Sequence, residues 1–265
     1  MFVLSTGYVG VSSALALEGT KCSKIGQKRS VAGQSFNCVR DGKRGLRWKS
    51  ASGSKTVPTT STTPGVSCAQ GGPCSVGDRG PGGGIIFLVV TTPFAFACGP
   101  RLEGSCTILE AAPEHWQLDV SVNLPDTGDP LRNWAARSNF YVSVAGVGAG
   151  RVEFGTGYAN SLAIAAQSGN SSLDTAAVLA LSYKGGSKSD WYLPARDELH
   201  YAQLRINNIL GGFASGAYWT STESGQIYGL QVNFPYGHIG GQQKNTHLPN
   251  DNSFTFARVR PIRSF

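Results

Sequence analysis

Two stretches of the chain repeat their apolar residues with the period of an α-helix. In the stretch 193–210 these residues recur three or four positions apart, at Leu199, Ala202, Ile206 and Ile209. In the stretch 171–183, Ser171 and Asp174 precede an alanine-rich run with the spacing of a helix start. The pattern predicts two helices, over 171–183 and 193–210.

Elsewhere the apolar residues form shorter runs that favour strands. IIFLVV, residues 85–90, is typical of a strand buried on both faces. After the second helix, short β segments begin at Tyr218, Ile227 and Ser253, and the last of these alternates its side chains along SFTFARVRPIRSF. Two helices followed by a cluster of short strands predict an α+β domain.

The glycine-rich stretch GDRGPGGGIIF, residues 77–87, has three interpretations. Glycine recurs every third residue over only a few triplets, which excludes a collagen helix. A phosphate-binding loop would lead into a helix, whereas a strand is predicted to follow here. We therefore expect the glycines to supply left-handed backbone conformations and close backbone approach at the start of a buried strand.

Composition divides the chain into four parts. Residues 1–16 are apolar and small but lack a basic n-region, so they are either a signal peptide, complete or truncated, or a buried strand; we favour the signal peptide and export. Residues 17–50 are predicted to form a small β module around one cysteine pair, and residues 51–67 a Ser/Thr/Pro-rich linker. Residues 68–265 are long enough for a core of their own. No apolar run is long enough to predict a transmembrane segment.

The six cysteines fall in pairs that are close in sequence. The pairs are Cys22 with Cys38, Cys68 with Cys74, and Cys98 with Cys106. An even number of cysteines in an exported chain favours disulfides. If neighbouring cysteines pair in sequence order, each disulfide would close and restrain a short local loop. None of the four histidines has a zinc-ligand spacing from a cysteine, so the sequence predicts no metal site and no cofactor.

The net charge of +7 is distributed unevenly, because residues 17–60 hold ten basic and two acidic residues while the rest is nearly neutral. This balance predicts that the small module binds polyanions. The basic residues proposed for this role are Lys21, Lys24, Lys28, Arg29, Arg40, Lys43, Arg44, Arg47 and Lys49. No nucleic-acid motif accompanies them, so we expect an acidic cell-surface polymer and not nucleic acid as the partner.

Six motifs follow one another along residues 68–265. They are CAQGGPCSVGDRGPGGGIIF, CGPRLEGSCTILEAAPEHW, GTGYANSLAIAAQ, SDWYLPARDELHYAQLR, YWTSTES and ARVRPIRSF. In this series the chain resembles the Lcl C-terminal-domain family, domains with a C-type-lectin-like fold named after a collagen-like bacterial adhesin. The resemblance implies a compact domain with two helices and a short-strand cluster that presents a loop-rich ligand face.

The chain also departs from this family and from calcium-dependent lectins. The family's name-giving member binds sulfated polysaccharides through a trimeric, positively charged surface, whereas residues 68–265 are nearly neutral. Polyanion binding is therefore assigned to the basic module. The W-N-D, E-P-N and Q-P-D patterns of calcium-dependent sugar binding are missing, so we expect no calcium-dependent binding.

The polar and aromatic loop 233–252 is the candidate ligand-binding surface of the large domain. Its candidate residues are Tyr236, His238, Gln242, Gln243, Lys244, Asn245 and His247. The alternative interpretation of this loop is an ordinary exposed hairpin.

Other conspicuous residues are given structural roles. The Trp/Tyr pairs at 191–192 and 218–219 are expected in the core, and Asp197 with Glu198 is interpreted as helix-start charge. Arginines near the C-terminus are expected to pair with these carboxylates or with Glu223; they are Arg258, Arg260 and Arg263.

The sequence thus predicts a secreted or surface-associated bacterial binding protein, an adhesin that recognises a glycan or another extracellular ligand. An enzyme is not expected, because G-x-S-x-G and H-E-x-x-H motifs are missing and the cysteines are assigned to disulfides. The alternative is a structural surface protein whose lectin-like domain docks a protein partner.

Overall fold

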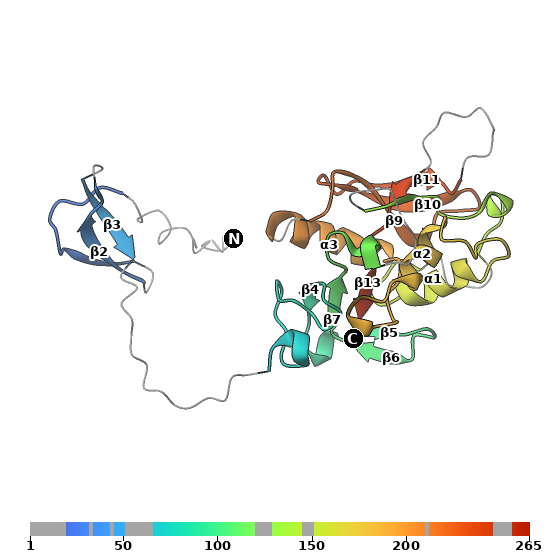
Figure 1. The fold of residues 1–265 in the computed structure, drawn as a ribbon, viewed down its shortest axis with the longest axis horizontal. Coiled ribbons are helices and arrows are strands. Elements are labelled where there is room, and N and C mark those ends of the chain that lie inside the picture. The colour runs from blue at the N-terminus through green and yellow to red at the C-terminus, as the bar shows by residue number, and fades with distance from the viewer. Residues whose placement is uncertain are drawn as a thin grey trace, which may run out of the picture. The chain divides into compact units, whose positions relative to one another are not determined.

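The computed structural model describes residues 20–31, 34–42, 45–50, 66–119, 129–144, 151–209, 212–245 and 256–265. The chain divides into two compact units, Met1–Thr63 and Pro64–Phe265, whose elements are drawn in Figure 1. This division falls inside the predicted linker, residues 51–67. The predicted signal peptide, residues 1–16, lies outside the described residues, as do residues 51–65 of the linker.

The smaller unit is built on one antiparallel sheet in the order β1-β2-β3. Its strands are β1 (Lys28–Val31), β2 (Gln34–Arg40) and β3 (Leu46–Ser50). Phe36, Cys38 and Trp48 form its buried cluster, and the Cys22–Cys38 disulfide ties the segment before β1 to the central strand. So small a cluster provides little burial, which is why a unit of this size depends on its disulfide.

The larger unit is mixed α+β and contains several sheets. Its five-stranded sheet has the order β11-β10-β9-β12-β8 and its three-stranded sheet the order β13-β7-β4, while β5 and β6 form a separate hairpin. The strands of the five-stranded sheet are β8 (Leu131–Arg132), β9 (Gly216–Glu223), β10 (Tyr228–Phe234), β11 (Ile239–Gln243) and β12 (Ala257–Arg258). The others are β4 (Ile85–Val89), β5 (Phe96–Cys98), β6 (Gly104–Cys106), β7 (Ile108–Ala111) and β13 (Ile262–Ser264).

The described residues of the larger unit contain three α-helices, where the sequence predicted two. They are α1 (Gly157–Ala165), α2 (Ala176–Ser182) and α3 (Arg196–Ile209). Helix α1 was not predicted, because small and polar residues, among them Asn160 and Ser161, occupy its buried face and leave no apolar stripe. Helix α2 begins at Ala176, later than predicted, and is preceded by a turn in which the Ser172 hydroxyl donates to the Asp174 carboxylate at 2.9 Å.

Aromatic side chains fill the core between the helices and the five-stranded sheet. The four residues of the two predicted Trp/Tyr pairs, 191–192 and 218–219, are fully buried, which confirms their packing role. Leu199 of α3 packs against Tyr218, Val232 and Phe234 and so fixes this helix on β9 and β10. In Figure 1 the helix lies below these strands, with one of its faces turned away from them.

The glycine-rich stretch 77–87 behaves as predicted. It bends into β4 with left-handed backbone at Gly83 (φ +81°), and a Cβ on Gly84 would lie 2.0 Å from the Ala111 carbonyl oxygen. The amides of Gly82 and Gly84 donate to the carboxylate of Glu110, which is fully buried. These glycines therefore bind an internal carboxylate of β7 and leave no room for an external anion.

Three disulfides join the cysteines in the predicted sequential pairs. Besides Cys22–Cys38 they are Cys68–Cys74 and Cys98–Cys106, with sequence separations of 6 and 8. The Cys98–Cys106 bond joins the last residue of β5 to the last residue of β6 and so cross-links the two strands of this hairpin. Each bond thus closes a short local loop, as the sequence analysis anticipated.

The C-terminal alternating segment was predicted as one strand and is two. Strand β12 pairs with β8 and β9, whereas β13 pairs with β7 in the other sheet. Pro261, which has no amide hydrogen to donate to a ladder, lies between them. The chain therefore crosses from one sheet to the other within the segment whose alternating side chains predicted a single strand.

Candidate functional site

One face of the small β-sheet gathers basic residues. Directly opposite residues of antiparallel strands project from the same face, and Lys28, Asn37 and Lys49 are opposite one another across the three strands. In the neighbouring row Arg47 lies opposite both Val39 and Lys21. Because Phe36 and Cys38 alternate with Asn37 and Val39 along β2, this face is the one opposite the buried cluster. We call Lys21, Lys28, Arg47 and Lys49 the basic face.

The other basic residues predicted to bind polyanions are not all part of this face. Arg29 and Arg40 are exposed but lie opposite Phe36 and Leu46, on the side of the sheet that carries the buried cluster. Lys24 is exposed in the turn before β1. The remaining two predicted residues, Lys43 and Arg44, lie outside the described residues.

The predicted ligand loop divides into exposed and buried residues. Tyr236 is 76% exposed in the β10–β11 turn, with its ring centroid 6.2 Å from that of exposed His238. Gln242 and Gln243 lie half-buried on β11, and His247 lies outside the described residues.

Lys244 and Asn245 correct the prediction of an exposed binding loop, because both are buried. The Lys244 ammonium forms an ion pair with Glu223, donates to the Val142 carbonyl oxygen at 3.0 Å and lies 4.9 Å from the Trp134 ring centroid. Burial lowers the pKa of Lys244, while the pairing with Glu223 opposes that shift. Lys244 therefore holds segments of the domain together and is not presented to a ligand.

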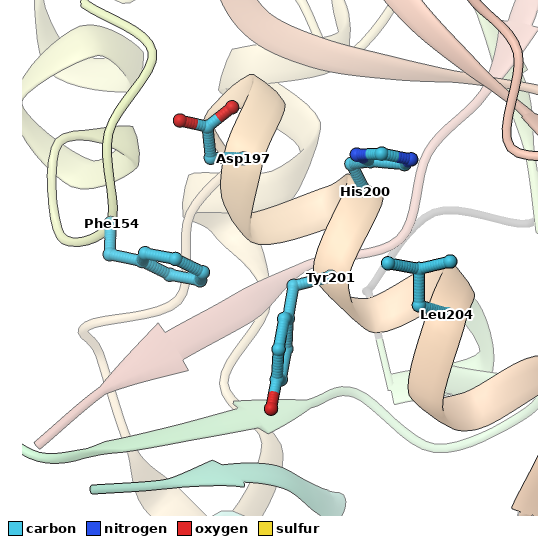
Figure 2. A pocket seen from close by; sticks show the side chains of 5 residues that line it. All are labelled: Phe154, Asp197, His200, Tyr201 and Leu204. Carbon is cyan, nitrogen blue, oxygen red and sulfur yellow. The ribbon is translucent and has the colours of Figure 1, made fainter. Parts of the chain in front are cut away.

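A hollow of about 210 Å³ lies on the face of α3 that is turned away from the sheet. Its lining residues are Phe154, Asp197, His200, Tyr201 and Leu204. Figure 2 shows the four helical residues following one another along α3, while Phe154 extends from the loop before α1 toward Tyr201. Their spacing of three, four and seven positions from Asp197 puts the helical residues on a single face.

The hollow combines aromatic and polar groups. The Phe154 ring meets the Tyr201 ring edge to face, with centroids 5.7 Å apart. The Asp197 carboxylate accepts a hydrogen bond from Arg196 Nε at 2.8 Å, and Arg205 Nε donates to the Tyr201 hydroxyl at 3.0 Å. The apolar stripe of α3 predicted the helix, but this second stripe of polar and aromatic residues was not predicted as a site.

Glu198, the neighbour of Asp197 in the first turn of α3, is a helix-start carboxylate as predicted, but it is buried inside the domain. Its side chain is fully buried, and its carboxylate accepts hydrogen bonds from the Gly155 amide at 2.8 Å, the Ala195 amide at 2.7 Å and the Tyr192 hydroxyl at 3.0 Å. These bonds attach the loop that carries Phe154 to the start of α3. Burial raises the pKa of Glu198 to about 7, against the lowering effect of the three donors.

We expect the stability of the larger unit to fall between pH 5 and pH 7 because of Glu198. Its folded pKa of about 7 exceeds the ordinary value of 4.5, so the folded state keeps a proton that the unfolded state releases in this interval. The loss amounts to roughly 3 kcal/mol and levels off above the folded pKa. The measurement is denaturant unfolding of the wild type and of Glu198→Gln at several pH values. The contribution of Glu198 is the difference between their free energies of unfolding. A difference that stays constant from pH 5 to pH 8 would contradict this assignment.

Two of the three C-terminal arginines, Arg260 and Arg263, form buried ion pairs, but with partners other than those predicted. Arg260 binds Asp129 through Nε at 2.5 Å and Nη2 at 2.7 Å. Arg263 binds the carboxylates of Glu110 and Asp190, at 3.1 and 2.8 Å. Arg258 donates to the Asp129 carbonyl oxygen at 3.1 Å. The predicted partners are bound elsewhere: Asp197 pairs with Arg196 and Glu223 with Lys244, while the fold brings acids more distant in sequence to Arg260 and Arg263.

A second hollow, of about 220 Å³, offers less chemistry. Its lining residues are Phe213, Ala214, Ser215, Phe234 and Pro235. The Ser215 hydroxyl is the sole side-chain polar group in that lining, so this hollow has little with which to orient a ligand.

Within the described ranges, no group of three or more His, Cys, Asp or Glu side chains is placed to hold a metal ion. No helix within the same ranges is long and apolar enough to cross a membrane. No protein-family model matches the chain, and the curated proteins contain no match to it.

Proposed function

We propose that this chain is a secreted or surface-associated bacterial binding protein, adhesin-like and without catalytic activity. In this proposal the small module binds an acidic polymer, and the larger unit, as a C-type-lectin-like domain of the Lcl C-terminal-domain kind, recognises a glycan. The observation that carries the proposal is the basic face, where Lys21, Lys28, Arg47 and Lys49 project together from one side of a disulfide-linked sheet. Three disulfides and a mixed α+β fold are compatible with it.

The basic face fits a linear polyanion better than a small anion. Its cations lie in two neighbouring rows across three strands, and strands in a sheet are about 4.8 Å apart. Lys49 of this face pairs with Asp41 at 3.8 Å between exposed groups, and such pairs contribute little. Repeated negative charges along a polymer can therefore meet several cations at once, each contact weak and screened by salt.

A protein-docking scaffold is the second candidate function. Tyr236, at the tip of the β10–β11 turn, is highly exposed and stands beside His238. Exposed tyrosines are enriched in protein interfaces. Binding of the whole chain to a protein partner, together with blank glycan arrays, would favour this function over glycan recognition.

We expect the double variant Lys28→Glu/Lys49→Glu to bind sulfated dextran at least about tenfold more weakly than the wild type at low salt. Both substitutions reverse charges in one row of the basic face, on either side of Asn37. The matched control is Arg29→Glu/Arg40→Glu, which changes the net charge equally on the opposite side of the sheet. The measurement is isothermal titration of the full chain at two salt concentrations. Equal losses in both variants, or wild-type binding that salt does not weaken, would contradict the proposal.

A further inference from the structure

We propose that the hollow on α3 is a binding site for a single uncharged pyranose ring that needs no metal ion. This inference rests on the proposed function and deepens it, because it names the ligand class and the surface of the larger unit. The site is built from Phe154, Asp197, His200, Tyr201 and Leu204, shown in Figure 2. It is separate from the loop 233–252 that the sequence analysis favoured.

The apolar part of the hollow matches the C–H face of a sugar ring. Phe154 and Tyr201 contribute aromatic surface to the lining, and Leu204, which is 51% exposed, adds aliphatic surface beside them. Aromatic rings with a polar handle are suited to ligands that are apolar on one side and polar at the edge. Aromatic and aliphatic surface provides no hydrogen-bond donors for a small inorganic anion.

The polar part of the hollow matches ring hydroxyls. Asp197 keeps acceptor positions in addition to the one used by Arg196 Nε, because an ionised carboxylate accepts about four hydrogen bonds. His200, one turn further along the same helix face, offers a ring nitrogen that donates and another that accepts. Carboxylate and imidazole together can therefore bind neighbouring hydroxyl groups of one ring.

The charges around the hollow select against a cationic ligand. Arg196 already pairs with Asp197, and the Arg205 guanidinium lies 5.2 Å from the Tyr201 ring centroid. A ligand ammonium group would find the carboxylate paired and that cation–π position occupied. A neutral polyol adds no positive charge beside Arg196 and Arg205, and its hydroxyl groups can donate to the remaining acceptor positions of Asp197.

Size and rigidity limit the ligand to one ring. The volume of about 210 Å³ is below the roughly 300–1,000 Å³ of pockets for drug-sized ligands. Glu198 fixes the Phe154 loop to α3 through the Gly155 amide, so the walls are held in place before a ligand arrives. For so open a site we expect a dissociation constant on the order of 1 mM.

The test is a ligand-observed NMR titration of the full chain with methyl glycosides of glucose, galactose and mannose. We expect saturable binding of at least one glycoside that is unchanged by a chelator, and no binding of choline. Leu204→Ala and His200→Ala should each weaken binding about fivefold or more. Matched controls are Leu162→Ala on α1, where the leucine is 36% exposed, and His238→Ala in the β10–β11 turn; both should bind like the wild type.

Several results would overturn the inference. They are loss of binding with the chelator, preference for choline, weakened binding in His238→Ala, or no glycoside binding at 50-fold excess over about 1 mM. Retention of the same samples on sulfated dextran separates the two proposals. If the wild type binds the polymer but no glycoside, the pyranose site alone is overturned. If the wild type does not bind the polymer, the proposed function is contradicted.

Discussion

Replacing Asp129 by alanine will lower the free energy of unfolding of the larger unit by about 3–5 kcal/mol, the usual cost of removing one partner of a buried ion pair. The Asp129 carboxylate is buried and binds Arg260 through two nitrogens. It also accepts hydrogen bonds from Trp116 Nε1 and the Tyr218 hydroxyl. Alanine would leave a buried guanidinium and two further donors without their acceptor.

Denaturant unfolding followed by tryptophan fluorescence measures this loss, because four of the five tryptophans are buried in the larger unit. Asp129→Asn is the second variant; it keeps the shape but turns an amide NH₂ group toward donors, so an intermediate loss is expected. Glu114→Ala, which removes an exposed carboxylate, is the control and should change stability by less than about 0.5 kcal/mol. A loss below about 1 kcal/mol in Asp129→Ala would show that the pair contributes little.

The second large effect is expected in the small module, where Cys22→Ala/Cys38→Ala should abolish the fold. The disulfide closes a loop of 16 positions, and cross-links of about that length contribute about 3 kcal/mol. The buried cluster has few members besides the cysteines, namely Phe36 and Trp48 with partly buried Leu46. A sheet of three short strands with so little burial does not retain a stable fold without the bond.

Amide hydrogen exchange of the full chain measures this effect strand by strand. Protection of β2 and β3 should disappear in the double variant, while protection of β9 and β10 stays as in the wild type. Cys98→Ala/Cys106→Ala is the matched control, because it removes a disulfide from the larger unit and should leave β2 and β3 protected. Persistent protection of β2 in Cys22→Ala/Cys38→Ala would mean that the hydrophobic cluster suffices.

Local patterns predicted those parts of the fold that depend on neighbouring residues. The stripe on α3, the apolar run that became β4 and the short cysteine spacings each carry their signal within a few positions. Helix α1 carries none, since polar Asn160 and small Ser161 are buried against segments that the sequence does not place beside them. Pro261 was a local indication of the break between β12 and β13, but the prediction of one strand followed the alternation of side chains along the segment.

The candidate sites depend more strongly on distant contacts. Glu198 follows Asp197 directly, and yet one is buried and the other lines a hollow, because the Gly155 amide, 43 positions away, covers Glu198. Lys244 looked like a surface cation because its partner Glu223 is 21 positions earlier and its carbonyl acceptor Val142 is 102 positions earlier. By contrast, the sequence predicted that the small module is basic, but only the strand register shows which of its cations lie on the same face of the sheet.

The order of the three disulfides bears on how the chain matures. Cys22 bonds Cys38, Cys68 bonds Cys74, and Cys98 bonds Cys106, so each loop closes before the next begins. A polypeptide that emerges with its N-terminus first presents every thiol to its own partner before a competing pair is available. Oxidation in the order of synthesis would therefore lead directly to the native linkages.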